Sequence, residues 1–358
     1  MKSQVNKLNF TGQNFYVGVD IHKKKWKVSI EHEMMPVKTF VQDPEPDILS
    51  NHLKRNYPGA TYHTAYEASY CGFWIHYRLK ELGINSIVVN AADIPTTHKE
   101  KTQKEDKRDS KKIAKCLRNG NLTPIYVPPV KTIQDRGLIR MRYTLAKEKR
   151  RVKNRIQAFL LFHGIKCPEE FAPKSGHWSK KFISWLESLS FERESAAYSL
   201  SVLIGQLKAI KLALIEITKE IRKLARTPDY KRKVDILMSI PGIGLITAML
   251  LITELDDINR FKSLDRLCSY IGLVPSTHSS GENDLTGEIT PRRHNALRTA
   301  IIESSWIAIR HDPALLMKYN DLCKKMESEK AIIRIAKKLT NRIRFVMKNE
   351  KEYVTSTV

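Results

Sequence analysis

The feature that most constrains the fold is a pair of short strand-like runs close to the N-terminus. Residues 16–21 form an apolar run with one carboxylate, Asp20, and residues 25–30 then alternate polar with apolar. This pattern predicts a β-hairpin with Asp20 on its first arm. A carboxylate on a half-buried strand is costly unless a positive charge meets it. Asp20 therefore predicts an Arg or Lys partner or a bound metal ion, and on this run alone a salt-bridged or exposed Asp is the simpler interpretation.

The segments that follow alternate between strand and helix patterns. They are a strand at 37–41, a helix at 46–55, a strand at 61–66 that ends on Glu67, a helix at 72–82 and a short buried strand at 85–89. Strands that alternate with helices after an opening meander predict an α/β layer with a mixed sheet. Asp20 and Glu67 are then expected at or near strand ends of that one sheet.

The next segment, residues 97–112, is dense in charge and is ordinarily a solvated surface. Within it Asp106 and Asp109 stand three apart at the start of a predicted helix that runs to Arg118. That spacing places both carboxylates on one face of the first helical turn. They are either acids that favour the positive end of the helix dipole or ligands of a metal ion, and both interpretations stay open.

The middle of the chain predicts two long helices. Residues 131–163 read as one basic helix, with the cationic side chains Lys147, Lys149, Arg150, Arg151, Lys153 and Arg155. Residues 192–226 read as a second helix with a near-heptad apolar stripe from Leu200 to Leu224. Such a stripe is typical of a coiled-coil or antiparallel arm, and equally of a core helix.

Two later segments could contact phosphate groups. Residues 236–248 predict a helix, a turn with Gly242 and Gly244, and a new helix. This is the pattern of a helix-hairpin-helix, whose turn points N–H groups at a phosphate, although a plain interhelical turn is the competing interpretation. Residues 278–287 then predict a polar loop with serines, followed by Arg292, Arg293 and Arg298. Guanidinium groups near a serine can stabilise charge on a phosphoryl group under attack.

The overall charge points to a polyanionic partner. Among 358 residues, 62 Lys and Arg oppose 38 Asp and Glu, which gives a net charge of +24. An excess of this size favours nucleic acid as the partner. No apolar run approaches the length of a membrane span, and the first residues lack the apolar core of a signal peptide. The five cysteines occur without CxxC pairs, which predicts reduced thiols in the cytosol.

The order of these motifs resembles that of the DEDD transposases of the insertion sequence 110 family. The resemblance runs over about residues 14–346, through Gly18-Val19-Asp20, Tyr66-Glu67, Asp106 to Asp109, Pro241-Gly242-Ile243-Gly244 and Ser280-Gly281. This family includes the Piv-type invertases and the bridge-RNA-guided recombinases. The resemblance implies three domains: a RuvC-like (RNase H-fold) domain at 14–130, a helical coiled-coil arm at 131–230, and a mainly helical transposase domain at 231–348.

The resemblance also implies a site and a chemistry. It assigns an acidic tetrad of Asp20, Glu67, Asp106 and Asp109 that holds Mg²⁺, with Mn²⁺ as a substitute. It assigns Ser280, rather than the neighbouring Ser279, as a nucleophile that forms a covalent phosphoserine link to DNA. The implied partners are DNA at the element ends and target, a structured guide RNA, and further copies in a homodimer or tetramer, without a membrane. The implied location is the bacterial cytoplasm, in association with the nucleoid.

We expect nucleic-acid contacts from basic and glycine residues of the arm and the C-terminal domain. They are Lys147, Arg150, Arg151, Lys153, Arg155, Gly242, Gly244, Arg292, Arg293 and Arg298. One departure from the family pattern is Arg293, which stands where a glycine is common and puts the geometry of this turn in question. Two alternative functions remain at this stage: a structure-selective nuclease that uses the tetrad and water, and a non-catalytic nucleic-acid-binding protein.

Overall fold

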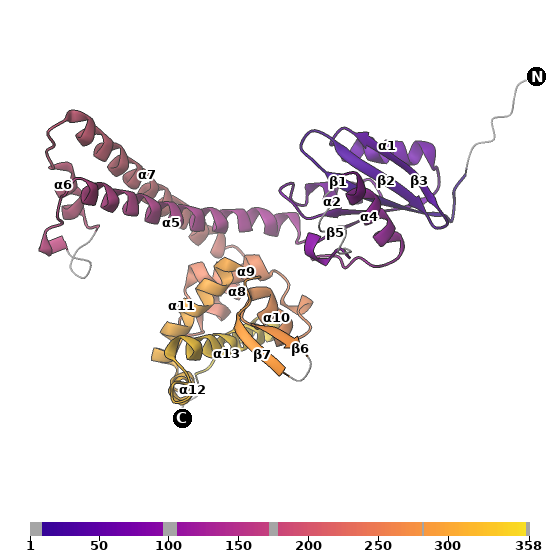
Figure 1. The fold of residues 1–358 in the computed structure, drawn as a ribbon. Helices are drawn as coiled ribbons and strands as arrows, with labels where there is room; N and C mark the ends of the chain where they lie inside the picture. The colour runs from indigo at the N-terminus through magenta and orange to yellow at the C-terminus, as the bar shows by residue number, and fades with distance from the viewer. Residues whose placement is uncertain (1–8, 96–105, 172–177, 281–282, 356–358) are drawn as a thin grey trace, which may run out of the picture. The chain divides into compact units, whose positions relative to one another are not determined.

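The structure is a computed structural model that describes residues 9–95, 106–171, 178–280 and 283–355 (Figure 1). The chain divides into two compact units, Met1–Val127 and Pro128–Val358, and each is described by itself. The predicted boundary near residue 230 stays a prediction. The arm helices share one apolar core with the C-terminal helices through Ile139 and Ile221.

The first unit is built on a five-stranded mixed sheet. Its strands are β1 (Asn14–Ile21), β2 (Trp26–His32), β3 (Pro36–Gln42), β4 (Thr61–Glu67) and β5 (Asn85–Val89). Their order is β3-β2-β1-β4-β5. The β1–β2 and β2–β3 pairs are antiparallel, whereas β1–β4 and β4–β5 are parallel. The predicted hairpin with Asp20 on its first arm and the predicted mixed sheet are therefore confirmed.

Helices cover both faces of this sheet. On one face α1 (Pro46–Asn56) and α2 (Trp74–Glu81) pack their buried leucines and isoleucine against β1 and β2. The strand residues on that side alternate along β1, as Val17 and Val19 do. The other face carries α4 (Asp106–Arg118), which contacts β1, β2 and β4. The residues that alternate with Val17 and Val19 along β1, such as Gly18, therefore point to the opposite face and toward α4.

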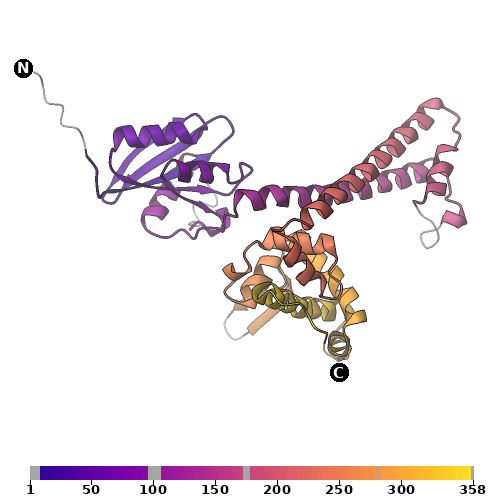
Figure 2. The same cartoon turned by 180° about the vertical axis from the view of Figure 1, so that it is seen from behind.

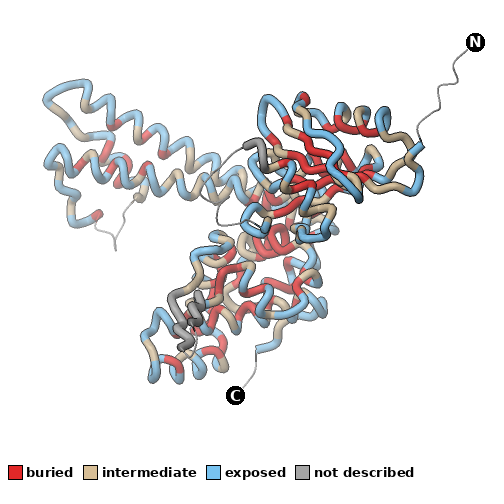
Figure 3. Tube along the Cα trace, turned by 45° about the vertical axis from the view of Figure 1, so that its right-hand side comes forward, coloured by how far each residue is buried: buried red, intermediate tan, exposed pale blue. Residues whose placement is uncertain are grey.

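The second unit begins with two long helices that pack against each other. They are α5 (Val130–Phe162) and α7 (Glu194–Ala225), and they lie side by side in both views (Figures 1 and 2). Near one end they are joined by α6 (Lys180–Glu187) through a core that includes Ile156, Phe182 and Leu207. Figure 3 shows that exposed and half-buried residues predominate along this pair, which we call the arm. Both predicted long helices are thus present.

The remaining helices share one apolar core with α9 (Leu245–Leu255), whose residues 248–255 are all buried. They are α8 (Lys231–Met238), α10 (Leu264–Ile271), α11 (Asn295–His311), α12 (Pro313–Cys323) and α13 (Ser328–Asn349). A helix that is apolar all round belongs in a core, and α9 lies there. No helix in the described part of the chain is both long and apolar enough to cross a membrane. The five cysteines are free thiols.

Candidate active site

Two of the predicted acidic residues lie at the same level near the ends of neighbouring parallel strands. The β1–β4 pairing runs through Gly18 opposite Ala65 to Val19 opposite Tyr66, so Asp20 and Glu67 are the next residues of the two strands. Because side chains alternate along a strand, Asp20 and Glu67 lie on the same face as Gly18 and Ala65. Neighbouring strands are about 4.8 Å apart. The sheet therefore brings these two carboxylates to one end of the face that α4 covers.

Helix α4 crosses this face in close contact with β1. A Cβ atom on Gly18 would lie 2.1 Å from the carbonyl oxygen of Ser110 and 2.4 Å from the amide nitrogen of Ala114. The buried hydroxyl Oγ of Ser110 is also 2.9 Å from Ser29 Oγ of β2. Only a glycine on β1 permits so close an approach of the helix backbone. Gly18 thus fixes how near α4 sits to the strand that carries Asp20.

The direction of α4 places its N-terminal end with the two strand carboxylates. Near the other end of the helix, Arg118 pairs with Glu31 of β2 at 2.7 Å, and Glu31 lies opposite Tyr16 of β1. The helix therefore runs antiparallel to β1, and Asp109, directly before Ser110, lies toward the Asp20 end. Asp109 is half-buried. Asp106 is the first residue of α4, but its side chain lies outside the described residues.

Asp20 makes an acid–base contact with a histidine at this end of the sheet. His22 Nε2 lies 3.1 Å from Asp20 Oδ2, and the Asp20 side chain is 18% exposed. Lys27 of β2 stands opposite Asp20 in the strand register. The sequence predicted a Lys or Arg partner or a metal ion for Asp20, and did not predict the contact with His22. The available signal was the spacing of two along a strand, which sends both side chains to one face.

The three described carboxylates fit a divalent metal ion by their chemistry. Mg²⁺ prefers oxygen ligands, and Asp20, Glu67 and Asp109 offer carboxylate oxygens from three elements that meet at one end of the sheet. Among the side chains that the structure describes, no group of three or more His, Cys, Asp or Glu is already drawn together as a ligand set. Like charges repel one another, so a cation is needed to bring such groups closer.

The predicted serine lies in the second unit, on a β-hairpin. The strands β6 (Pro275–Ser280) and β7 (Asn283–Ile289) are antiparallel, with Ser280 opposite Asn283 and Ser279 opposite Asp284. The predicted polar loop at 278–287 is wrong, because the backbones of residues 278–280 and 283–285 pair as antiparallel strands. Thr290 N–H closes the base of the hairpin on Val274 O at 3.0 Å. The side chains of Ser279 and Ser280 lie outside the described residues.

The arginine segment after the hairpin packs against the end of α10. Gly272 ends α10 with a φ of +87°, and a Cβ there would lie 2.4 Å from Arg293 Cβ. This contact accommodates the family departure at Arg293. The Arg298 guanidinium donates to Thr290 O at 3.2 Å. Burial and the nearby Arg293 lower the pKa of Arg298, so these two predicted residues lie in one basic region at the hairpin base.

A buried carboxylate that sequence analysis missed lies beneath this segment. Glu254 of α9 is 1% exposed and accepts from Arg140 Nε at 2.7 Å and Nη2 at 2.8 Å. Arg136 Nε and His294 Nε2 lie within 3.3 Å and 3.1 Å of the same carboxylate. Burial would raise the pKa of Glu254, but the hydrogen bonds from His294 and Arg140 outweigh it and lower the pKa to about 2. The signal for it in the sequence was a single acidic residue inside the apolar run 245–255.

His294 links this buried cluster to the arginine segment. Its Nδ1 accepts from the N–H of Leu297 at 3.3 Å and so caps the start of α11. Its other ring nitrogen, Nε2, therefore carries the proton that is donated to Glu254. Because Arg136 and Arg140 belong to α5, the cluster connects the base of the arm with the turn that follows the serine hairpin.

The remaining predicted contact residues lie in two places, the turn between α8 and α9 and the helix α5. A Cβ on Gly242, whose φ is +86°, would lie 2.3 Å from the carbonyl oxygen of Ser304 in α11. This contact favours the tight interhelical turn as the explanation of Gly242, whereas Gly244 is exposed and has nothing within 4 Å of such a Cβ. The predicted basic residues of α5 are exposed, except for the half-buried Lys153. Arg151 among them is paired with Glu148.

Comparison with known proteins agrees with the motifs. Residues 17–164 match the family model described as a transposase of the DEDD insertion sequence 110 type, and residues 234–320 match the transposase IS116/IS110/IS902 family. The transposase for insertion sequence element IS1533 of Leptospira borgpetersenii is 27% identical over 68% of this chain and 70% of its own length. The transposase for insertion sequence element IS1111A of Coxiella burnetii is 25% identical over 59% of this chain and 56% of its own.

Some relatives are longer than the region that aligns. A relative from Sinorhizobium fredii is 28% identical over 70% of this chain, but the match spans only 59% of that protein. The first family model matches the sheet together with α4 and α5. The second matches α8 to α12 and the hairpin that contains Ser280. Together they cover more than half of the chain. The chain belongs to the IS110 family of transposases, which both models name.

Proposed function

We propose that this protein is a DNA transposase or site-specific recombinase that cleaves and rejoins DNA strands through a serine nucleophile. The observation that supports this most strongly is the packing of α4 on Gly18. This packing brings Asp109 to the end of the sheet where Asp20 of β1 and Glu67 of β4 lie. Family membership and the relatives named as transposases of insertion sequence elements support the same function.

The first unit would act as an RNase H-fold, RuvC-like catalytic domain. Its strand order, with three antiparallel strands followed by two parallel ones, agrees with that assignment. Asp20, Glu67, Asp106 and Asp109 would hold Mg²⁺, for which Mn²⁺ could substitute. When bound, the metal would make a hydroxyl group more acidic and offset negative charge on the phosphate. The chain's own contribution would be to hold the half-buried Asp20 and Asp109 beside the exposed Glu67, at the end of the sheet where β1, β4 and α4 meet.

Ser280 would supply the nucleophile. Its Oγ forms a bond to phosphorus while the bond from phosphorus to a deoxyribose oxygen breaks. That deoxyribose oxygen takes up the proton that the Ser280 hydroxyl loses. Attack by a deoxyribose hydroxyl of another strand then reverses the exchange and returns the proton to Ser280. The phosphodiester energy is kept in the covalent link, so rejoining needs no nucleotide cofactor. Arg292, Arg293 and Arg298 would stabilise negative charge on the phosphate.

The partners follow from the same proposal. DNA at the element ends and target would be the substrate, and a structured guide RNA would choose the sites by base pairing while the protein holds the backbones. The net charge of +24 supports binding to both. A homodimer or tetramer, with the arm as a coiled coil, is part of the proposal, and the cell's nucleoid is its expected location. Sedimentation as a monomer with and without nucleic acid would count against self-association.

The proposal is tested by trapping the covalent link. Wild-type protein, Mg²⁺, labelled DNA that contains an element end and target, and the co-expressed flanking RNA are incubated and run on a denaturing gel. A labelled adduct should form with wild type and with the matched control Ser279→Ala, and should be absent with Ser280→Ala and with Asp20→Asn. Cleavage without an adduct, unaffected by Ser280→Ala, would instead indicate a hydrolytic nuclease.

A further inference from the structure

Two lysines of the arm contact Trp178, and a third lysine lies near both of them. Lys149 and Lys153 are four residues apart, so they share one face of α5, and Lys211 comes from α7. The Lys153 ammonium lies over the ring of Trp178, 4.9 Å from its centroid. The Lys211 ammonium donates to the carbonyl oxygen of Trp178 at 3.4 Å. We call Lys149, Lys153 and Lys211 the lysine cluster.

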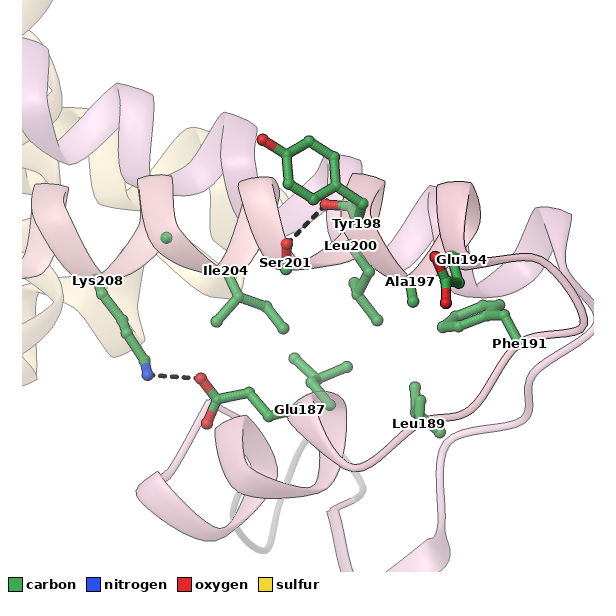
Figure 4. A pocket seen from close by; sticks show the side chains of 12 residues that line it. Glu187, Leu189, Phe191, Glu194, Ala197, Tyr198, Leu200, Ser201, Ile204 and Lys208 are labelled. Carbon is green, nitrogen blue, oxygen red and sulfur yellow. Dashed lines mark hydrogen bonds and ion pairs between the residues drawn. The ribbon is translucent and has the colours of Figure 1, made fainter.

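The lysine cluster lacks acidic partners among the residues that the structure describes, whereas the other lysines of α7 are paired with glutamates. None of its three ammonium groups forms an ion pair with a carboxylate in the described part of the chain. By contrast, Lys208, one turn before Lys211, pairs with Glu187 of α6, as Figure 4 shows. Lys219 farther along α7 pairs with Glu216 at 2.8 Å. The positive charge of the cluster is therefore uncompensated within the arm.

The cluster is also partly withdrawn from water. Lys149, Lys153 and Lys211 are each half-buried. Burial, together with repulsion from Lys149, lowers the pKa of both Lys153 and Lys211. Half-buried like charges are costly, and a bound anion would remove that cost.

Trp178 holds an unusual backbone conformation at this point. Its φ is +70°, in the left-handed region that bulky side chains rarely adopt. Its ring packs edge-on against Phe182 of α6 with centroids 5.2 Å apart. Conformations of this kind persist where the surrounding structure specifies them, and they occur often at binding sites. Trp178 therefore holds two lysines from different helices at one place.

We propose that the lysine cluster is a binding site for phosphate groups of a nucleic-acid backbone. This inference rests on the proposed function for its choice of nucleic acid as the anion. The ligand chemistry is a phosphodiester, and the lysines would bind it as point charges without reading sequence. Because the site needs both arm helices, it would fix the position of a nucleic acid along the arm and not merely attract it.

The test measures binding in the absence of divalent metal, so no strand cleavage is needed. The probes are a labelled stem-loop RNA and a labelled DNA duplex of matching sequence, and affinity is followed by fluorescence anisotropy between about 50 and 200 mM salt. Each of Lys149→Gln and Lys211→Gln should weaken binding several-fold at the lower salt. Each should also reduce the slope of log affinity against log salt by about one, on whichever probe occupies the arm.

The matched control is Lys219→Gln, which removes one positive charge from α7 at a lysine already paired with a carboxylate. Circular dichroism establishes that each variant keeps its helices. A slope and affinity equal to those of the control on both probes would overturn the proposal. A loss on one probe alone would support it and identify the nucleic acid concerned. Failure of adduct formation with intact binding would bear on the proposed function and not on this site.

Discussion

At the scale of single residues, the second unit depends on the charge of Glu254. This carboxylate is almost fully buried, yet it receives hydrogen bonds from two elements that are far apart in the sequence, α5 and the residues before α11. A buried charge is tolerated only where its partners satisfy it, and removal of one partner leaves the others unpaired. Glu254 thereby couples the base of the arm to the turn that follows the serine hairpin.

Replacement of Glu254 by Gln should lower the free energy of unfolding by about 3–5 kcal/mol, because it leaves Arg136 and Arg140 with uncompensated charge. Thermal unfolding followed by circular dichroism measures the loss. Asp265→Asn is the control, because Asp265 is exposed and pairs with Lys337 at the surface. Such a pair contributes at most about 1 kcal/mol. Equal losses for the two variants would contradict the role given to Glu254.

The same residue predicts a pH dependence. The folded-state pKa of Glu254 is lowered to about 2 from an ordinary value of 4.5. A carboxylate with a lowered folded pKa contributes stability that is fully present above its unfolded pKa and is lost as pH falls through the folded value. The stability difference between wild type and Glu254→Gln should therefore be constant near neutral pH and shrink as pH falls from about 4.5 toward 2. A difference that stays constant over that range would contradict this prediction.

Gly18 controls the candidate active site by the absence of a side chain. In Gly18→Ala the new methyl group meets the backbone of α4, which cannot move aside cheaply, so α4 should be displaced at a cost of about 1–3 kcal/mol. Hydrogen exchange should become faster in β1 and α4. Gly137→Ala in α5 adds a methyl group with nothing within 4 Å and serves as the control. Unchanged protection of α4 in Gly18→Ala would show that this contact does not position the helix.

At the scale of elements, sequence patterns predicted most of the first unit and both arm helices. The apolar run 16–21 and the alternation along residues 25–30 were enough to predict the β1–β2 hairpin. The strands β6 and β7 were not predictable from residue propensity, because their polar residues suit a loop equally well. Only the pairing of their backbones distinguishes a strand from a loop here. The contacts of Glu254 and the lysine cluster were also hidden, because they join residues that are far apart in the sequence.

The turn between α8 and α9 offers a prediction at this scale. Gly242→Ala should destabilise the second unit by about 1–3 kcal/mol, since it combines a left-handed φ with a clash against α11. Gly244→Ala should be tolerated, because its φ of −92° suits any residue and the added methyl group meets nothing. Urea unfolding of the two variants makes the comparison. Equal stability of both would argue against the close contact with Ser304.

At the scale of the whole molecule, the groups of the proposed reaction are divided between the two units. The acidic residues lie in the first unit, and Ser280, with its neighbouring arginines, lies in the second. Sequence resemblance was needed to connect them, because no local pattern joins a carboxylate on a strand to a serine more than two hundred residues later. The proposed reaction requires both groups to act on one phosphodiester. Cleavage should therefore pass through Ser280 and depend on the carboxylates of the other unit.

The most direct test is to identify the residue that carries DNA after the reaction. The trapped adduct is digested with a protease and a nuclease, and mass spectrometry locates the remaining nucleotide on the peptide. We expect a phosphodeoxynucleotide on Ser280 in the wild type and none in an Asp20→Asn variant that retains its fold. A nucleotide on another residue, or an adduct on Ser280 that forms equally well in Asp20→Asn, would contradict it.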